Sequence, residues 1–262
     1  MTERTDGDRQ DRLEAATGTH RPFGWVLLTQ LVVYAIMIVL GACSNGDQLD
    51  PDSLSFSLTT TAVVAMIVIY AFFNPLRDGI PGRIVALVCG FLSMIFATTP
   101  ILGNAFFHGQ QIVDRDGAVA AGYIMPQAWL AGAAILFVVV IVAAFVCQMA
   151  REDRSHLIVS LSAAVLDGIA SIAVAGWCFL PAMFSNATVV NFYGNSSLHA
   201  AWLAGWICIA VVAICLGGVS YTWNRDADPY PGAHCPWLGI GLTPAMFLGG
   251  IVAVAALANA LC

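Results

Sequence analysis

Seven long apolar runs constrain the fold of this chain more than any other feature of its sequence. They cover residues 23–43, 54–73, 84–102, 123–149, 157–184, 198–219 and 237–261. The hydrocarbon core of a bilayer is about 30 Å thick, and a helix of roughly 20 apolar residues crosses it while satisfying its own backbone hydrogen bonds. Because every run reaches about this length, we expect an all-α integral membrane protein, a bundle of seven transmembrane helices.

Composition supports one membrane domain and excludes a large soluble one. The 262 residues are 59% hydrophobic and 10% charged, and the stretches between the apolar runs are short. No soluble catalytic domain fits into these connections. Residues 1–22 are polar and lack an apolar stripe, so we expect a disordered tail there. Residues 23–262 then form a single seven-span transmembrane domain.

The arginines predict how the chain lies across the membrane, since lysine is absent. One set of segments carries Arg4, Arg9, Arg12, Arg21, Arg77, Arg83, Arg151, Arg154 and Arg225, and the other carries Arg115 alone. Positively charged loops stay in the cytoplasm. We therefore expect a cytoplasmic N-terminus and an outside C-terminus. Arginine without lysine, together with abundant alanine, valine and glycine, is typical of a GC-rich bacterial genome and indicates a bacterial cytoplasmic membrane.

Asp167 is the charged residue within the apolar runs and is the candidate functional carboxyl. It lies ten residues beyond Leu157, which at 1.5 Å per residue places it about 15 Å deep, near the middle of the bilayer. Such a group is costly in lipid and should point into the bundle. Two interpretations stay open: a structural hydrogen bond to a partner such as Gln30 or Ser171, or coupling of a proton or cation to function.

The last run carries a stripe of small residues, and two runs contain proline. The stripe recurs every four residues, at Gly241, Ala245, Gly249 and Ala253. Small residues at this spacing allow another helix to approach closely. Pro100 and Pro244 remove backbone donors within their runs and should kink them. Paired broken helices can line a transport site, although a purely structural kink is the alternative interpretation.

Cysteine and histidine do not predict a metal or redox site. The eight cysteines contain no Cys-x-x-Cys pair, and no two histidines should face each other within the hydrocarbon. We expect no metal and no cofactor. Cys43 and Cys262 both belong at the outer face and are either free or linked, if the first and last helices are neighbours. Residues 39–43 also have the form of a lipoprotein processing site, which would lipidate Cys43, whereas an uncleaved first helix is the default prediction.

The sequence lacks the functional motifs considered below, so we infer only the broad class of protein to which it belongs. The chain has no Gly-x-Ser-Gly turn for serine proteolysis and no His-Glu-x-x-His for zinc proteolysis, and it lacks the lysine that a retinal Schiff base requires. We predict a transport or permease-type component for a small solute, or a non-catalytic subunit of a membrane assembly. A membrane-embedded enzyme that modifies lipid or envelope components is the alternative. The expected partners are the lipid bilayer and other membrane subunits, not nucleic acid.

Overall fold

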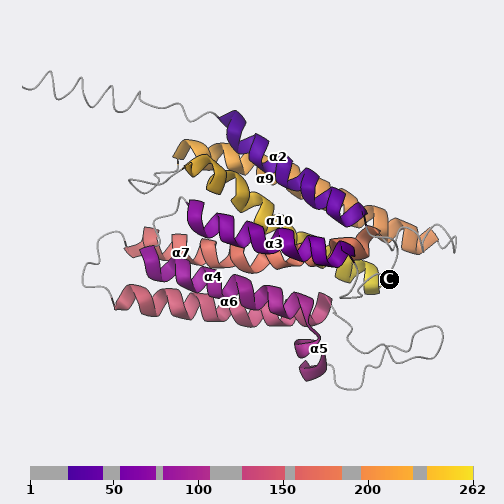
Figure 1. Ribbon diagram of the computed structural model, residues 1–262, viewed down its shortest axis with the longest axis horizontal. Helices are drawn as coiled ribbons and strands as arrows, with labels where there is room; N and C mark the ends of the chain where they lie inside the picture. Colours follow the sequence, from indigo (N-terminus) through magenta and orange to yellow (C-terminus); the bar gives the residue numbers. More distant parts are fainter. Residues whose placement is uncertain are drawn as a thin grey trace, which may run out of the picture.

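The structure, a computed structural model, describes residues 23–43, 54–74, 79–106, 126–150, 157–184, 196–226 and 235–261. Every element in these ranges is a helix (Figure 1). The elements are α2 (Phe23–Ala42), α3 (Leu54–Phe73), α4 (Gly79–Thr98), α5 (Ile101–Phe106), α6 (Pro126–Met149), α7 (Leu157–Ala173), the 3₁₀ helix η1 (Val174–Phe179), α9 (Ser196–Asp226) and α10 (Pro236–Leu261).

Seven helical stretches in the described ranges are long and apolar enough to cross a membrane, as predicted. Six are single helices, and the other joins α7, η1 and a further helical turn that ends at Phe184. This chain of apolar helices indicates a multi-pass membrane protein. The tail at 1–22 lies outside the described residues.

The largest differences between the predicted span ends and the helices are in α4 and α9. α4 begins at Gly79, five residues earlier than predicted, and therefore includes Arg83. It ends at Thr98, and the hydroxyl of Thr99 donates to the carbonyl of Ile95 at 2.6 Å. Pro100 then separates α4 from α5, so the expected kink is a complete break between two helices. α9 continues to Asp226, seven residues beyond the predicted end at Val219.

The helices run side by side in alternating directions, with α10 and the α7–η1 span at the centre (Figure 1). α10 packs against α2, α9, η1, α7 and α3, while α4, α6 and α7 form a three-helix group. We call the end where α2, α4, α7 and α10 begin the arginine-rich end, since Arg83 and Arg225 lie there. It is on the left in Figure 1.

The central helix α10 and the outer helix α9 differ in how much of their surface is buried. In α10, 72% of the residues in the apolar window are buried, compared with 11% in α9. The outward face of α9 presents large apolar side chains, including Ile207 and Ile214. A face of this kind suits contact with lipid chains, whereas α10 is surrounded by protein.

The small-residue stripe of α10 makes the contacts predicted for it. A Cβ added at Gly241 would lie 2.7 Å from the carbonyl oxygen of Val26 in α2. One added at Gly249 would lie 2.5 Å from the carbonyl oxygen of Ala173 in α7. The backbone of α10 therefore contacts two neighbouring helices directly, which only small side chains permit.

The sequence reasoning missed the 3₁₀ segment η1, which interrupts the fifth span. The N–H of Leu180 donates to the carbonyl of Trp177, three residues back, in place of the four-residue spacing of an α-helix. Pro181 follows and cannot donate to that same carbonyl. The tighter winding thus satisfies a backbone acceptor that an α-helix would leave unpaired.

We expect Gly249→Ala to lower the stability of the folded protein. The new methyl group would meet a backbone carbonyl that no side-chain rotation can move, and overpacking of this kind costs about 1–3 kcal/mol. The measurement is thermal unfolding of the purified protein in detergent. Gly218→Ala is the matched control, because a Cβ at Gly218 meets nothing within 4 Å. Equal melting temperatures for the two variants would contradict the close packing of α10.

Candidate functional site

Asp167 forms a buried polar contact between three helices. Its side chain is 1% exposed, and the amide Nδ2 of Asn74 donates to its Oδ2 at 2.8 Å. Asn74 follows the last residue of α3 and is itself buried. The guanidinium of Arg83, in α4, donates to the backbone carbonyl of Asn74 at 3.1 Å. The contact thereby ties α7 to the connection between α3 and α4.

The Asn74 contact shows where Asp167 lies along the bundle relative to α3. Asn74 marks the end of α3, so Asp167 is level with that helix end. α7 starts ten residues earlier, about 15 Å farther along the bundle axis, and Figure 1 shows it extending past α3. The predicted depth counts from Leu157, where α7 begins, and the depth of Asp167 in a bilayer stays a prediction.

The two partners suggested for Asp167 make other contacts. Gln30 donates to the hydroxyl of Tyr34 at 2.8 Å and accepts from the hydroxyl of Ser220 at 3.3 Å, which links α2 to α9. Ser171 lies one turn beyond Asp167 and packs against Gly90 of α4, where an added Cβ would be 3.1 Å from the Ser171 carbonyl oxygen. The structure therefore joins Asp167 to Asn74, whose carbonyl accepts from Arg83, and the sequence reasoning had proposed neither residue as a partner of the carboxyl.

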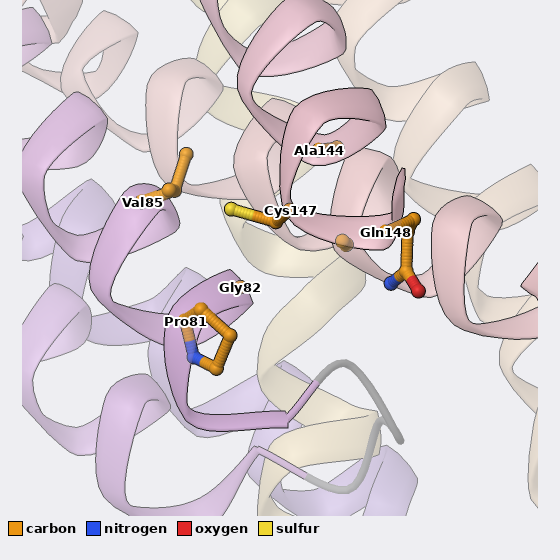
Figure 2. Close-up of a pocket in the computed structure, with 7 residues that line it drawn as sticks. Pro81, Gly82, Val85, Ala144, Cys147 and Gln148 are labelled. Carbon is orange, nitrogen blue, oxygen red and sulfur yellow. The ribbon is translucent and has the colours of Figure 1, made fainter. Parts of the chain in front are cut away.

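A small pocket lies between α4, α6 and α7, close to Asp167. Figure 2 shows it between the start of α4 and the end of α6. Its lining consists of Pro81, Gly82, Val85, Ala144, Cys147, Gln148 and Ala164. The empty space is about 290 Å³ including its open side, and its enclosed part has room for about one water molecule. Ala164 lies one helical turn from Asp167, so the pocket ends close to the carboxyl without including it.

Two hydrogen-bonded pairs of polar side chains lie near this pocket. The amide Nε2 of Gln148, in α6, donates to the hydroxyl of Ser160 in α7 at 2.7 Å, and both residues are buried. Ser160, Ala164 and Asp167 share one face of α7, since they are spaced at helical steps of four and three. The pocket wall thus runs from the Gln148–Ser160 pair toward the Asn74–Asp167 pair.

A further polar contact continues from Asn74 along α3 toward the centre of the bundle. Tyr70 lies one turn before Asn74, and the hydroxyl of Thr243 in α10 is 3.4 Å from the Tyr70 hydroxyl. Both side chains are buried. Thr243 also donates to the carbonyl of Gly239 at 2.8 Å and directly precedes Pro244. Buried polar groups therefore extend from Asp167 to the residues next to Pro244 in α10.

The described residues bear on the metal and cysteine predictions in part. The described part of the chain contains no group of three or more His, Cys, Asp or Glu side chains placed to hold a metal ion. α2 and α10 are neighbours, as a Cys43–Cys262 link requires. Cys43 is exposed at the end of α2, while Cys262 lies outside the described residues. That link and the lipidation of Cys43 stay predictions.

Comparison with protein-family models, curated proteins and solved structures found no match to this chain. Its function is therefore inferred from the contacts around Asp167 and from the arrangement of the helices.

We expect Asp167→Leu to destabilise the protein and Asp167→Asn to be tolerated. Leucine removes the acceptor of the Asn74 amide inside the bundle, and a buried donor left unsatisfied costs about 1–3 kcal/mol. Asparagine retains a carbonyl oxygen in the same place. Thermal unfolding of the purified variants measures the difference.

Ser162→Leu is the control for this pair, because Ser162 lies on an exposed face of the same helix. Its melting temperature should stay close to that of the wild type. A Leu variant at position 167 as stable as the wild type would show that the Asn74 contact contributes nothing to the fold.

Proposed function

We propose that the protein is a permease-type transport component for a small solute in a bacterial cytoplasmic membrane. The observation that carries this proposal is the buried Asp167 carboxyl, held by a neutral amide between α7 and the end of α3. Intramembrane carboxyl groups are costly, and in transporters they serve as proton or cation relays. Asp167 is assigned this coupling role.

The surroundings of Asp167 support transport more than catalysis. The adjacent pocket is small and mostly apolar, whereas an enzyme of lipid or envelope chemistry would need an open cleft with clustered polar groups. The pocket reaches Ala164, one turn from the carboxyl. A shift of α7 relative to α4 and α6 would join the two. The described conformation is then the closed state of a carrier whose site opens toward the arginine-rich end.

A subunit of a larger membrane assembly is the second candidate, and the exposure of α9 favours it. The apolar window of this helix is 11% buried, and a Cβ on Gly218 meets nothing within 4 Å. Another transmembrane helix could approach α9 closely along that face. In this case the protein by itself would carry no solute.

We expect a proton or cation flux that depends on Asp167. The full chain is reconstituted into liposomes that contain a pH-sensitive dye, and a panel of amino acids, sugars, carboxylates and monovalent cations is added outside. One solute class should change the internal pH in wild-type vesicles. Asp167→Asn keeps the hydrogen bond but binds no exchangeable proton, so the flux should fall to the level of empty liposomes.

Ser162→Ala is the control for the flux experiment and should retain wild-type rates. A folded Asp167→Asn variant with full flux would exclude the coupling role. Wild-type vesicles that respond to no solute in the panel would favour the assembly subunit.

The proposed orientation places the arginine-rich end in the cytoplasm, following the charge of the connecting segments. Cys43 and Cys235 are both exposed and lie at opposite ends of the helices. In single-cysteine variants, a membrane-impermeant maleimide should label Cys43 in intact cells. It should label Cys235 only after the cells are permeabilised. The reverse pattern would invert the orientation.

A further inference from the structure

Backbone interruptions occur in the two most buried spans. The windows of the α7–η1 span and of α10 are 61% and 72% buried, higher than any other span in the described residues. The first contains the 3₁₀ segment η1 followed by Pro181, and the second contains Pro244. Short 3₁₀ stretches and proline kinks inside long helices commonly mark the positions where a helix bends.

η1 and the Pro244 segment of α10 lie close to each other. A Cβ added to Gly176 of η1 would clash with the carbonyl oxygen of Gly249 in α10, so the two backbones are in direct contact there. The next residue, Trp177, donates its indole Nε1–H to the carbonyl oxygen of Ala245 at 2.8 Å. Ala245 directly follows Pro244. One side-chain hydrogen bond therefore joins the 3₁₀ segment of one span to the residue that follows the proline of the other.

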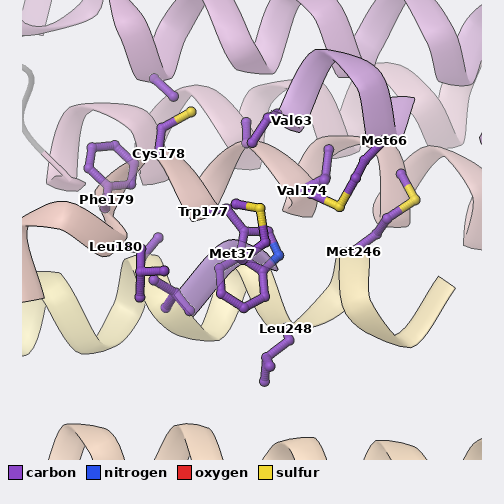
Figure 3. Close-up of a cluster of buried hydrophobic side chains, with 14 of the residues drawn as sticks. Met37, Val63, Met66, Val174, Trp177, Cys178, Phe179, Leu180, Met246 and Leu248 are labelled. Carbon is purple, nitrogen blue, oxygen red and sulfur yellow. The ribbon is translucent and has the colours of Figure 1, made fainter. Parts of the chain in front are cut away.

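The side chains around the contact between η1 and α10 can adapt to a change of packing. Met37, Met66 and Met246 belong to the buried cluster that contains Trp177 (Figure 3). Methionine has three rotatable bonds and no branch, so it refills a cavity whose shape changes more easily than leucine or isoleucine does. Rigid branched side chains at these positions would oppose bending.

We propose that η1 and the Pro244 segment of α10 form a hinge, and that the hydrogen bond from Trp177 to Ala245 is the latch that holds it closed. Opening of the hinge tilts α7 and so moves Asp167 relative to Asn74 and the pocket. This inference concerns backbone motion and holds whether or not a solute is carried, so its test is independent of the flux experiment.

Cys178 provides the measurement, because it lies in η1 and is 1% exposed. In a variant that retains Cys178 as its single cysteine, the rate of modification by N-ethylmaleimide in native membranes reports hinge opening. Trp177→Phe keeps an aromatic ring but removes the donor. We expect the rate to rise about threefold to tenfold, as the loss of one buried hydrogen bond implies.

Two controls distinguish opening of the hinge from a general loosening of the fold. Trp202→Phe removes another indole hydrogen bond, which is partly buried and runs 2.9 Å to the carbonyl of Met183. It does not involve Pro244 or Ala245, so the Cys178 rate should stay within twofold of wild type. Cys89 in α4 is 2% exposed and packs in a separate cluster. As the single cysteine it should react at the same rate with and without Trp177→Phe.

Pro244→Ala provides a test in the opposite direction. Alanine restores the backbone donor of an unbroken helix, which stiffens α10 and should lower the Cys178 rate at least threefold. An unchanged Cys178 rate in Trp177→Phe, or an equal rise at Cys178 and Cys89, would overturn the proposal. A faster Cys178 reaction in Pro244→Ala would also overturn it. If the Trp177→Phe protein does not accumulate, the Pro244→Ala result by itself tests the hinge.

Discussion

Direct contact between helix backbones at the centre of the bundle supports the rest of the structure. Gly249 and Gly176 allow α10 and η1 to meet without side chains between them. Between helices in lipid there is little hydrophobic driving force, so close van der Waals packing has to hold them together. α2 and α9 pack on the other sides of α10, and α7 extends from η1 to Asp167. The location of the Asp167 carboxyl therefore depends on a backbone contact between glycines and not on a polar side chain.

Much of the fold follows from the sequence because a bilayer permits few structures. Each apolar run had to be a helix to satisfy its backbone, and the seven runs correspond to seven membrane-length helical stretches. The spacing of Gly241 and Gly249 also predicted close packing correctly, since a four-residue step keeps small residues on one helical face. Burial of Asp167 followed from the cost of placing a charge in lipid.

The partners of Asp167 could not be obtained in the same way. Hydropathy locates a span but does not give its offset along the bundle axis, and this offset pairs Asp167 with Asn74. Asn74 directly follows an apolar run and Arg83 was counted as a loop residue, so neither was a candidate partner of Asp167. Pro181 was a visible signal for η1. The apolar run continues through it, however, and hydropathy alone does not distinguish a 3₁₀ turn from an α-helix.

The contrast between α9 and α10 has a consequence for how this sequence can change over evolution. In α9, 11% of the residues in the apolar window are buried, and one apolar side chain on its outward face can replace another at little cost to the fold. In α10, a single added methyl group at Gly249 meets a neighbouring backbone. Relatives of this chain should therefore diverge quickly along α9 while α10 retains its pattern of small residues. A search for distant relatives would gain most from the last 27 residues of the chain, 236–262.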